Sequence, residues 1–178
     1  KALKCGVRSI EHGILDDECV DLMLEKNAYY VPTICQTQDL ETILESGLPQ
    51  FMVDKALSVK EIHLEGFKKA YKAGVKIACG SDSPPLSQFT HLELKHLKIA
   101  GMSTVDTLKS GTTIPAELCG VSNTFGKIEE NYIADIIVLE DNPLNNLNTI
   151  FDPIMVFKNG IKFDEQYGLA SFEDIYIN

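Results

Sequence analysis

Three polar residues follow three segments that have the composition of buried β-strands. His12 and Thr33 lie at the ends of the first two segments, and Asp82 lies just past the end of the third. The carboxyl ends of parallel strands meet at one edge of a sheet, where α/β enzymes place their chemistry. Imidazole nitrogen and carboxylate oxygen are common ligands of zinc. The pattern therefore suits a divalent metal held by His12 and Asp82.

Each of these residues also has a structural interpretation. A histidine at a strand end is often hydrogen-bonded within the fold, and Gly80-Ser81-Asp82 fits an Asx-type turn or a helix cap. Two ligands are one short of a minimal catalytic zinc site. His91 begins a predicted helix nine residues after Asp82 and is a further candidate for the same edge. His63 and His96 lie on apolar helical stripes, which favours core positions.

The segments that must position these residues alternate between strand and helix. Strands are predicted at 7–12, 28–33 and 75–79, separated by helical runs. This order is typical of βα units around a parallel sheet. The long connection after Thr33 contains a predicted short helix at 40–44. Candidates for ligand contacts near this connection are Tyr30, Gln36 and Gln38. A solvated connector explains these polar residues more simply.

The helical runs are predicted from apolar spacing and from end signals. Gly74 should end a long helix, Ser103 with Asp106 resembles a capping box, and Pro115 suits the first turn of a last helix. The predicted buried faces are Val20, Met23 and Leu24 in the first helix, Val59, Ile62, Phe67 and Ala70 in the long helix, and Leu92, His96 and Ile99 in the next one.

From about residue 121 the sequence takes on β character. Ile133 to Leu139 is a nearly continuous apolar run rich in isoleucine, typical of a strand. Asn159-Gly160 separates the short apolar runs 156–158 and 161–163. That arrangement strongly predicts a two-residue hairpin.

Composition restricts the class of protein. The chain has 178 residues, 26 acidic and 16 basic, a net charge of -10 and 44% hydrophobic residues. These values exclude a disordered tail and a nucleic-acid clamp, and no apolar run reaches the roughly 18 residues of a membrane span. The five cysteines form no C-x-x-C pair, which favours reduced, mostly buried thiols in a cytoplasmic protein. Because it begins with Lys1, we expect the sequence to start inside a longer chain.

Three βα units cannot close a barrel, which uses about 250 residues for eight units. An isolated wedge would leave apolar surface and strand edges open. The wedge is therefore completed by further sequence or by partners, or the protein is a small open α/β sheet.

The motifs occur in an order that resembles the amidohydrolase superfamily, in the branch of imidazolonepropionase-like hydrolases and Xaa-Pro or Xaa-Arg dipeptidases. The resemblance reaches about residue 163. The segments that carry it are Cys5-Gly6-Val7-Arg8-Ser9-Ile10-Glu11-His12-Gly13, Val31-Pro32-Thr33, Ala73-Gly74-Val75-Lys76-Ile77-Ala78-Cys79-Gly80-Ser81-Asp82, His91-Leu92-Glu93-Leu94, Thr112-Thr113-Ile114-Pro115-Ala116-Glu117-Leu118, Ala134-Asp135-Ile136-Ile137-Val138-Leu139 and Asn142-Pro143-Leu144.

The resemblance implies an α/β fold that is part of a metal-dependent-hydrolase TIM-type barrel. Residues 1–122 would be its last three βα units, and residues 123–178 would be the carboxy-terminal β segment of a small composite β-sandwich domain and a tail. The remaining ligands and strands would come from a missing N-terminal part of the same chain. Without that part, we expect this fragment to bind metal weakly or not at all and to be inactive.

The resemblance also implies a reaction, hydrolysis of an amide, peptide or cyclic-amide C–N bond through metal-bound hydroxide. His12 and Asp82 would bind the metal, most simply zinc with one or two ions in the complete protein. Asp82 would also be the catalytic proton shuttle. His91 and Thr33 would contact the substrate or the metal ligands.

The expected partner is a dipeptide or other small-molecule substrate, with no nucleic acid and no membrane. A second copy in a homo-oligomer is a further candidate. Two alternatives stay open. One is a non-catalytic binding or scaffold module that retains part of the barrel. The other is an unrelated open α/β domain, in which His12 and Asp82 would lie more than about 8 Å apart, too far to share one zinc ion.

Overall fold

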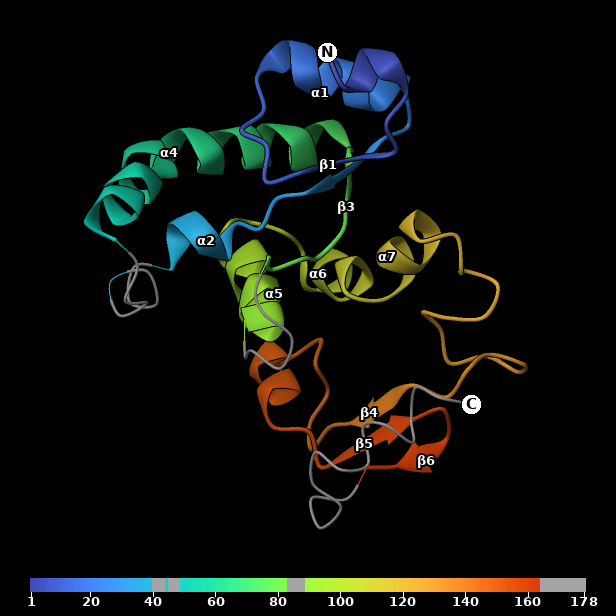
Figure 1. The fold of residues 1–178 in the computed structure, drawn as a ribbon. Coiled ribbons are helices and arrows are strands. Elements are labelled where there is room, and N and C mark those ends of the chain that lie inside the picture. Colours follow the sequence, from blue (N-terminus) through green and yellow to red (C-terminus); the bar gives the residue numbers. More distant parts are fainter. Residues whose placement is uncertain (40–43, 45–48, 83–88, 164–178) are drawn as a thin grey trace.

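The structure is a computed structural model that describes residues 1–39, 44, 49–82 and 89–163. Figure 1 shows its helices and strands. In chain order they are η1 (Leu3–Cys5), β1 (Ser9–Glu11), α1 (Asp17–Glu25), β2 (Tyr29–Val31), α2 (Cys35–Gln38), α4 (Gln50–Ala73), β3 (Lys76–Ile77), α5 (Phe89–Ile99), α6 (Thr104–Ser110), α7 (Thr113–Leu118), β4 (Ile136–Val138), η2 (Leu147–Phe151), β5 (Met155–Lys158) and β6 (Ile161–Lys162).

The first three strands form a parallel sheet in the order β1-β2-β3. Ile10 pairs with Tyr30, and Tyr30 pairs with Ile77, so the strands are in register at their centres. This confirms the predicted α/β class and the positions of the strands, although each strand is shorter than predicted. Strand β1 ends before His12, which leaves the extended conformation. Strand β2 ends before Pro32, which has no N–H to donate.

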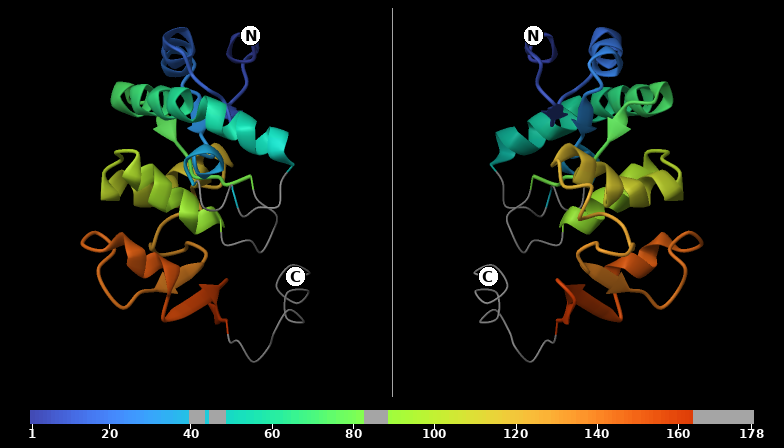
Figure 2. Two further views of the ribbon diagram at one scale, coloured as in Figure 1. Left: turned by 90° about the vertical axis from the view of Figure 1, so that its left-hand side faces the viewer. Right: turned by 90° about the vertical axis from the view of Figure 1, so that its right-hand side faces the viewer.

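The helices surround this sheet. Figures 1 and 2 show α1 and α4 above the three strands and α5, α6 and α7 below them. One apolar core joins the sheet to α1, α4 and α5. Its buried members are Leu3, Leu15, Val20, Met23, Ala28, Tyr30, Ile34, Phe67, Ala70, Val75, Ile77, Leu97, Ala100 and Met102.

The predicted helix and turn signals are confirmed where the structure describes them. Helix α4 ends at Gly74 in the left-handed conformation, and α6 begins after Ser103, whose hydroxyl accepts a hydrogen bond from the Asp106 amide. Asn159 and Gly160 both have positive φ and connect β5 to β6, as the hairpin signal requires. The helix predicted around Leu40 and Ile43 lies outside the described residues.

Three predicted buried positions are wrong. Leu24, Ile62 and Ile99 are 43%, 56% and 68% exposed. The buried face is instead formed by Glu93 and Leu97 of α5 and by Ala100, which follows the helix. These residues follow a helical spacing of four and three, but the first is charged, so a search for an apolar stripe selects the wrong face of the helix.

The second sheet is antiparallel, with the order β4-β5-β6. Strand β4 lies within the predicted apolar run, and its Ile137 pairs with Val156. Ile137, Val156 and Ile161 are exposed, as are several neighbouring apolar side chains. This sheet therefore presents apolar surface that no described part of the chain covers.

The five cysteines are free thiols, as predicted, but most of them are not buried. Cys35 is buried, Cys19 and Cys79 are partly buried, and Cys5 and Cys119 are exposed because they lie at the ends of short surface helices. Among the described residues, no helix combines the length and the hydropathy that crossing a bilayer would require.

Candidate active site

The predicted site residues share an unusual backbone conformation. His12, Thr33 and Asp82 have φ angles of 56°, 49° and 51°, in the left-handed region. The other described non-glycine residues with positive φ are all asparagines. Asparagine, aspartate and histidine are the types enriched in this region, so Thr33, which is β-branched, is the exception. For most L-residues the conformation costs roughly 1–2 kcal/mol. Backbone strain of this kind clusters at functional sites, and here Thr33 is the residue that bears it.

The left-handed turns bring His12 and Asp82 together. His12 Nε2 lies 3.9 Å from Asp82 Oδ1, and the two side chains are 49% and 66% exposed. Both groups therefore face solvent at the carboxyl edge of the sheet. The separation contradicts the alternative of an unrelated open domain, which required the two residues to lie far apart.

Thr33 determines which nitrogen of His12 is available. Its hydroxyl donates a hydrogen bond to the Pro32 carbonyl at 2.7 Å, and His12 Nδ1 lies 2.8 Å from the same hydroxyl oxygen. A hydroxyl has one proton, so with that proton committed to Pro32 the oxygen accepts from Nδ1–H. The lone pair of the neutral imidazole is then on Nε2, the atom that faces Asp82.

The donor set fits a borderline divalent cation. An imidazole lone pair and a carboxylate at one edge match the ligand preferences of zinc, and a hydrogen bond to the other ring nitrogen is the usual support for a metal-binding histidine. Within the described ranges no group of three or more His, Cys, Asp or Glu side chains is close enough to form a complete site. His12 and Asp82 thus provide a partial ligand set.

His91 lies near the start of α5 and is half-buried. Its ring packs edge-on against Phe151 of η2, with the ring centres 4.7 Å apart. Burial lowers the pKa of His91, which favours the neutral imidazole. A contact with the substrate stays a prediction for this residue.

Sequence analysis did not select Glu93 as a site residue, yet it is fully buried beneath this edge. Its carboxylate accepts hydrogen bonds from the amides of Ile34 at 2.9 Å and Cys35 at 2.8 Å. Burial raises the pKa of Glu93, while the two amides act in the opposite direction. The signal that could have found it is a charged residue spaced with Leu97 and Ala100 on one helical face.

The candidates for ligand contact from the long connection make internal contacts instead. Tyr30 is buried and donates its hydroxyl to the Gly13 carbonyl. Gln36 Nε2 donates to the Ser81 carbonyl at 2.7 Å, and Gln38 Nε2 donates to the Lys60 carbonyl at 2.9 Å. These contacts hold the strand ends and α2 in place.

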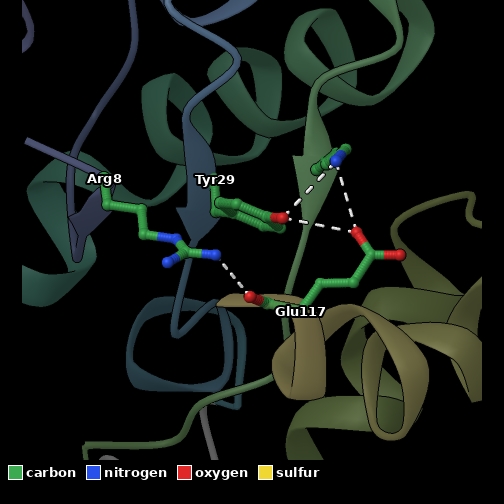
Figure 3. Close-up of polar contacts among 4 residues, drawn as sticks. Arg8, Tyr29 and Glu117 are labelled. Atoms are coloured by element: carbon green, nitrogen blue, oxygen red, sulfur yellow. Dashed lines mark hydrogen bonds and ion pairs between the residues drawn. The ribbon is translucent and has the colours of Figure 1, made fainter. Parts of the chain in front are cut away.

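A second polar cluster lies at the opposite, amino-terminal end of the strands (Figure 3). Tyr29 lies between Arg8 and Lys76, and its hydroxyl donates to Glu117 at 3.3 Å. Lys76 Nζ lies 3.2 Å from Glu117 Oε2, and Arg8 donates to the Glu117 carbonyl. The cluster ties α7 to the sheet, and in barrels this face contributes to stability rather than to chemistry.

Comparisons with known proteins agree on one family. A model described as the amidohydrolase family matches residues 2–162. An ochratoxinase from Aspergillus niger is 33% identical over 155 residues, which cover 85% of this chain and 32% of the ochratoxinase. The chain therefore spans about a third of the length of this curated relative.

Solved structures give the same result. A Xaa-Pro dipeptidase with bound methionine has a TM-score of 0.81 and 33% identity, covering 92% of this chain and 41% of the dipeptidase. A prolidase complexed with N-methylphosphonate-L-proline has a TM-score of 0.80 and 32% identity, with the same 92% and 41% coverage. Both likenesses extend over nearly the whole of this chain.

Proposed function

Because this chain belongs to the amidohydrolase family, we propose that it forms the carboxy-terminal part of a metal-dependent hydrolase that cleaves a C–N bond. The substrate class is a dipeptide or a related small amide, in keeping with the dipeptidase and prolidase that the chain resembles. The observation that carries this proposal is the pair formed by His12 and Asp82, which face each other across 3.9 Å at the carboxyl edge of the sheet.

The proposal includes an architecture. Residues 1–122 would supply the last three βα units of a TIM-type barrel, and residues 123–178 would supply one segment of a small β-sandwich and the tail. Within the described residues, β1 and β3 each pair with β2 alone, so both outer edges of the sheet are open. The exposed apolar face of the second sheet has the same explanation, since another segment would cover it.

Each site residue would have a role that follows from its chemical type. His12 Nε2 and Asp82 would hold one side of a divalent metal, most simply zinc, in a site of one or two ions. When bound, such a metal supplies Lewis acidity toward the scissile carbonyl and lowers the pKa of water. The Asp82 carboxylate would accept a proton from the attacking water and pass it to the leaving amine.

The surrounding residues would prepare these two groups. Thr33 keeps the Nε2 lone pair of His12 available, and His91 would contact the substrate from α5. The five free thiols fit a reducing, cytoplasmic setting, which is part of this proposal. A second copy of the protein is a further proposed partner.

The test measures hydrolysis of Xaa-Pro dipeptides by the natural protein that contains this sequence, with and without Asp82→Asn. We expect the wild type to release proline, a chelator to abolish the activity, and added zinc to restore it. Asp82→Asn should lower kcat by about 10²–10⁴-fold, the usual contribution of a positioned proton-transfer group.

The matched control is Asp17→Asn, which changes an exposed carboxylate that pairs with Lys69 on the surface. This variant should retain wild-type activity. A wild type that hydrolyses no dipeptide or other amide and binds no metal would favour the non-catalytic module. Full activity in Asp82→Asn would remove Asp82 from the mechanism.

A further inference from the structure

Glu93 is a carboxylate with no exposed surface, located in the middle of α5. Burial of a charged group is costly unless hydrogen bonds match it. Both carboxylate oxygens are matched by the backbone, since Oε1 accepts from the Ile34 amide and Oε2 from the Cys35 amide. Glu93 therefore holds the start of α2, a helix too short to be stable by itself.

The other end of α2 is held from the same helix. His96 lies three residues after Glu93, on the neighbouring turn of α5, and its Nε2 is 3.2 Å from Asp39 Oδ2. Both side chains are largely buried. Helix α5 thus binds both ends of α2, at Cys35 through Glu93 and at Asp39 through His96.

The segment held in this way, Thr33 to Gln38, contacts one candidate metal ligand and the residue that precedes the other. At its start, the Thr33 hydroxyl lies 2.8 Å from His12 Nδ1, within hydrogen-bond distance. In its middle, Gln36 Nε2 donates to the Ser81 carbonyl, which belongs to the residue before Asp82. His12 and Asp82 come from β-strands that are not adjacent in the sheet, so α2 and the residues before it connect them.

We propose that Glu93 is a positioning residue for the metal site, acting through the amides of Ile34 and Cys35 on the segment that orients His12 and Asp82. This inference rests on the proposed function, because it assigns Glu93 a role toward the metal that His12 and Asp82 would hold. The carboxylate touches neither ligand, and its effect passes through Thr33 and Gln36.

The substitution Glu93→Gln tests the proposal with little change in volume. An amide has one acceptor oxygen where the carboxylate has two, and its NH₂ group would face a backbone N–H. One of the two α2 amides would then lose its acceptor. We expect zinc affinity, measured by chelator competition on the natural protein that contains this sequence, to fall about tenfold or more.

The matched control is Leu97→Ala, one turn further along α5. Leu97 is also fully buried, but it packs in the apolar core. This variant should lower Tm at least as much as Glu93→Gln and leave the zinc dissociation constant within about twofold of wild type. If both variants weaken zinc binding in proportion to their loss of Tm, Glu93 is only a structural residue.

A second variant covers the case in which Glu93→Gln does not fold. Gln36→Leu removes the hydrogen bond to Ser81 from a residue whose surface is exposed, so the core is unchanged. We expect weaker zinc binding with little change in Tm, and unchanged zinc binding would overturn the proposal. If the wild type itself binds no zinc and hydrolyses nothing, the proposed function fails instead.

Discussion

A neutral imidazole has one lone pair, so the partner of Nδ1 decides whether the Nε2 of His12 can bind a cation. In this structure that partner is the Thr33 hydroxyl, whose own proton is committed to the Pro32 carbonyl. The left-handed backbone at Thr33 is unfavourable for a β-branched side chain. Thr33 therefore has an unfavourable backbone conformation at the position where its hydroxyl meets His12 Nδ1.

Replacing Thr33 with valine tests this relation. Valine keeps the shape of threonine but has no hydroxyl, so His12 Nδ1–H would lose its acceptor. We expect zinc affinity to fall about 10–100-fold, the usual effect of removing such a support, as measured by isothermal titration calorimetry. Thr33→Ser, which retains the hydroxyl, should bind zinc nearly as well as wild type. Equal affinities for the serine and valine variants would show that the hydroxyl has no part in metal binding.

At the residue level, sequence patterns locate polar side chains at strand ends, because residue type and position coincide there. His12, Thr33 and Asp82 were selected because strand ends are recognisable, and the structure places all three at one edge. Glu93 was not selected, because its importance depends on two backbone amides that are 59 and 58 residues away. No local pattern contains such a contact.

Among the elements, α6 shows how far local signals extend. Its start was predicted from Ser103 and Asp106, and the structure has the Ser103 hydroxyl accepting from the Asp106 amide at 3.0 Å. The same hydroxyl and the Tyr71 hydroxyl donate to the Asp106 carboxylate. In contrast, α2 was not predicted, since four residues show no periodicity and its ends are fixed by α5.

The cap of α6 gives a prediction for stability. Ser103→Ala should lower the free energy of unfolding by about 1 kcal/mol in urea titrations. Ser58→Ala, in the interior of α4, is the control and should cause no loss, since alanine favours helix interiors. If the two variants are equally stable, the Ser103 cap does not contribute to stability.

The same cap has a defined pH dependence. Hydrogen bonds from Ser103 and Tyr71 lower the pKa of Asp106 below its usual value. Because the pKa is lower in the folded state, the ionised Asp106 carboxylate makes its full contribution to folding stability above the unfolded-state pKa of about 3.9. This stability contribution is lost as the pH falls through the folded-state pKa of Asp106. This acid-dependent loss should be smaller in Ser103→Ala, because that variant removes the main cause of the shift.

For the whole molecule, the sequence predicted the parallel sheet, its strand positions and the antiparallel hairpin, because βα alternation and Asn-Gly turns are local patterns. The remaining metal ligands, and the strands that would pair with β1 and β3, cannot be predicted from these local patterns. Within the described residues, the sheet has open edges at β1 and β3, and two candidate ligands of a metal are present rather than three. The proposed function therefore needs further ligands and strands from outside the described residues.

The divalent metal content of the natural protein that contains this sequence tests this account most directly. It should be measured together with the intact mass, on the wild type and on His12→Ala and Asp82→Ala. We expect a chain well over twice this length that retains one or two zinc-class ions per molecule, and a loss of metal in both variants. A folded wild-type protein without metal, or variants that keep the full metal content, would contradict it.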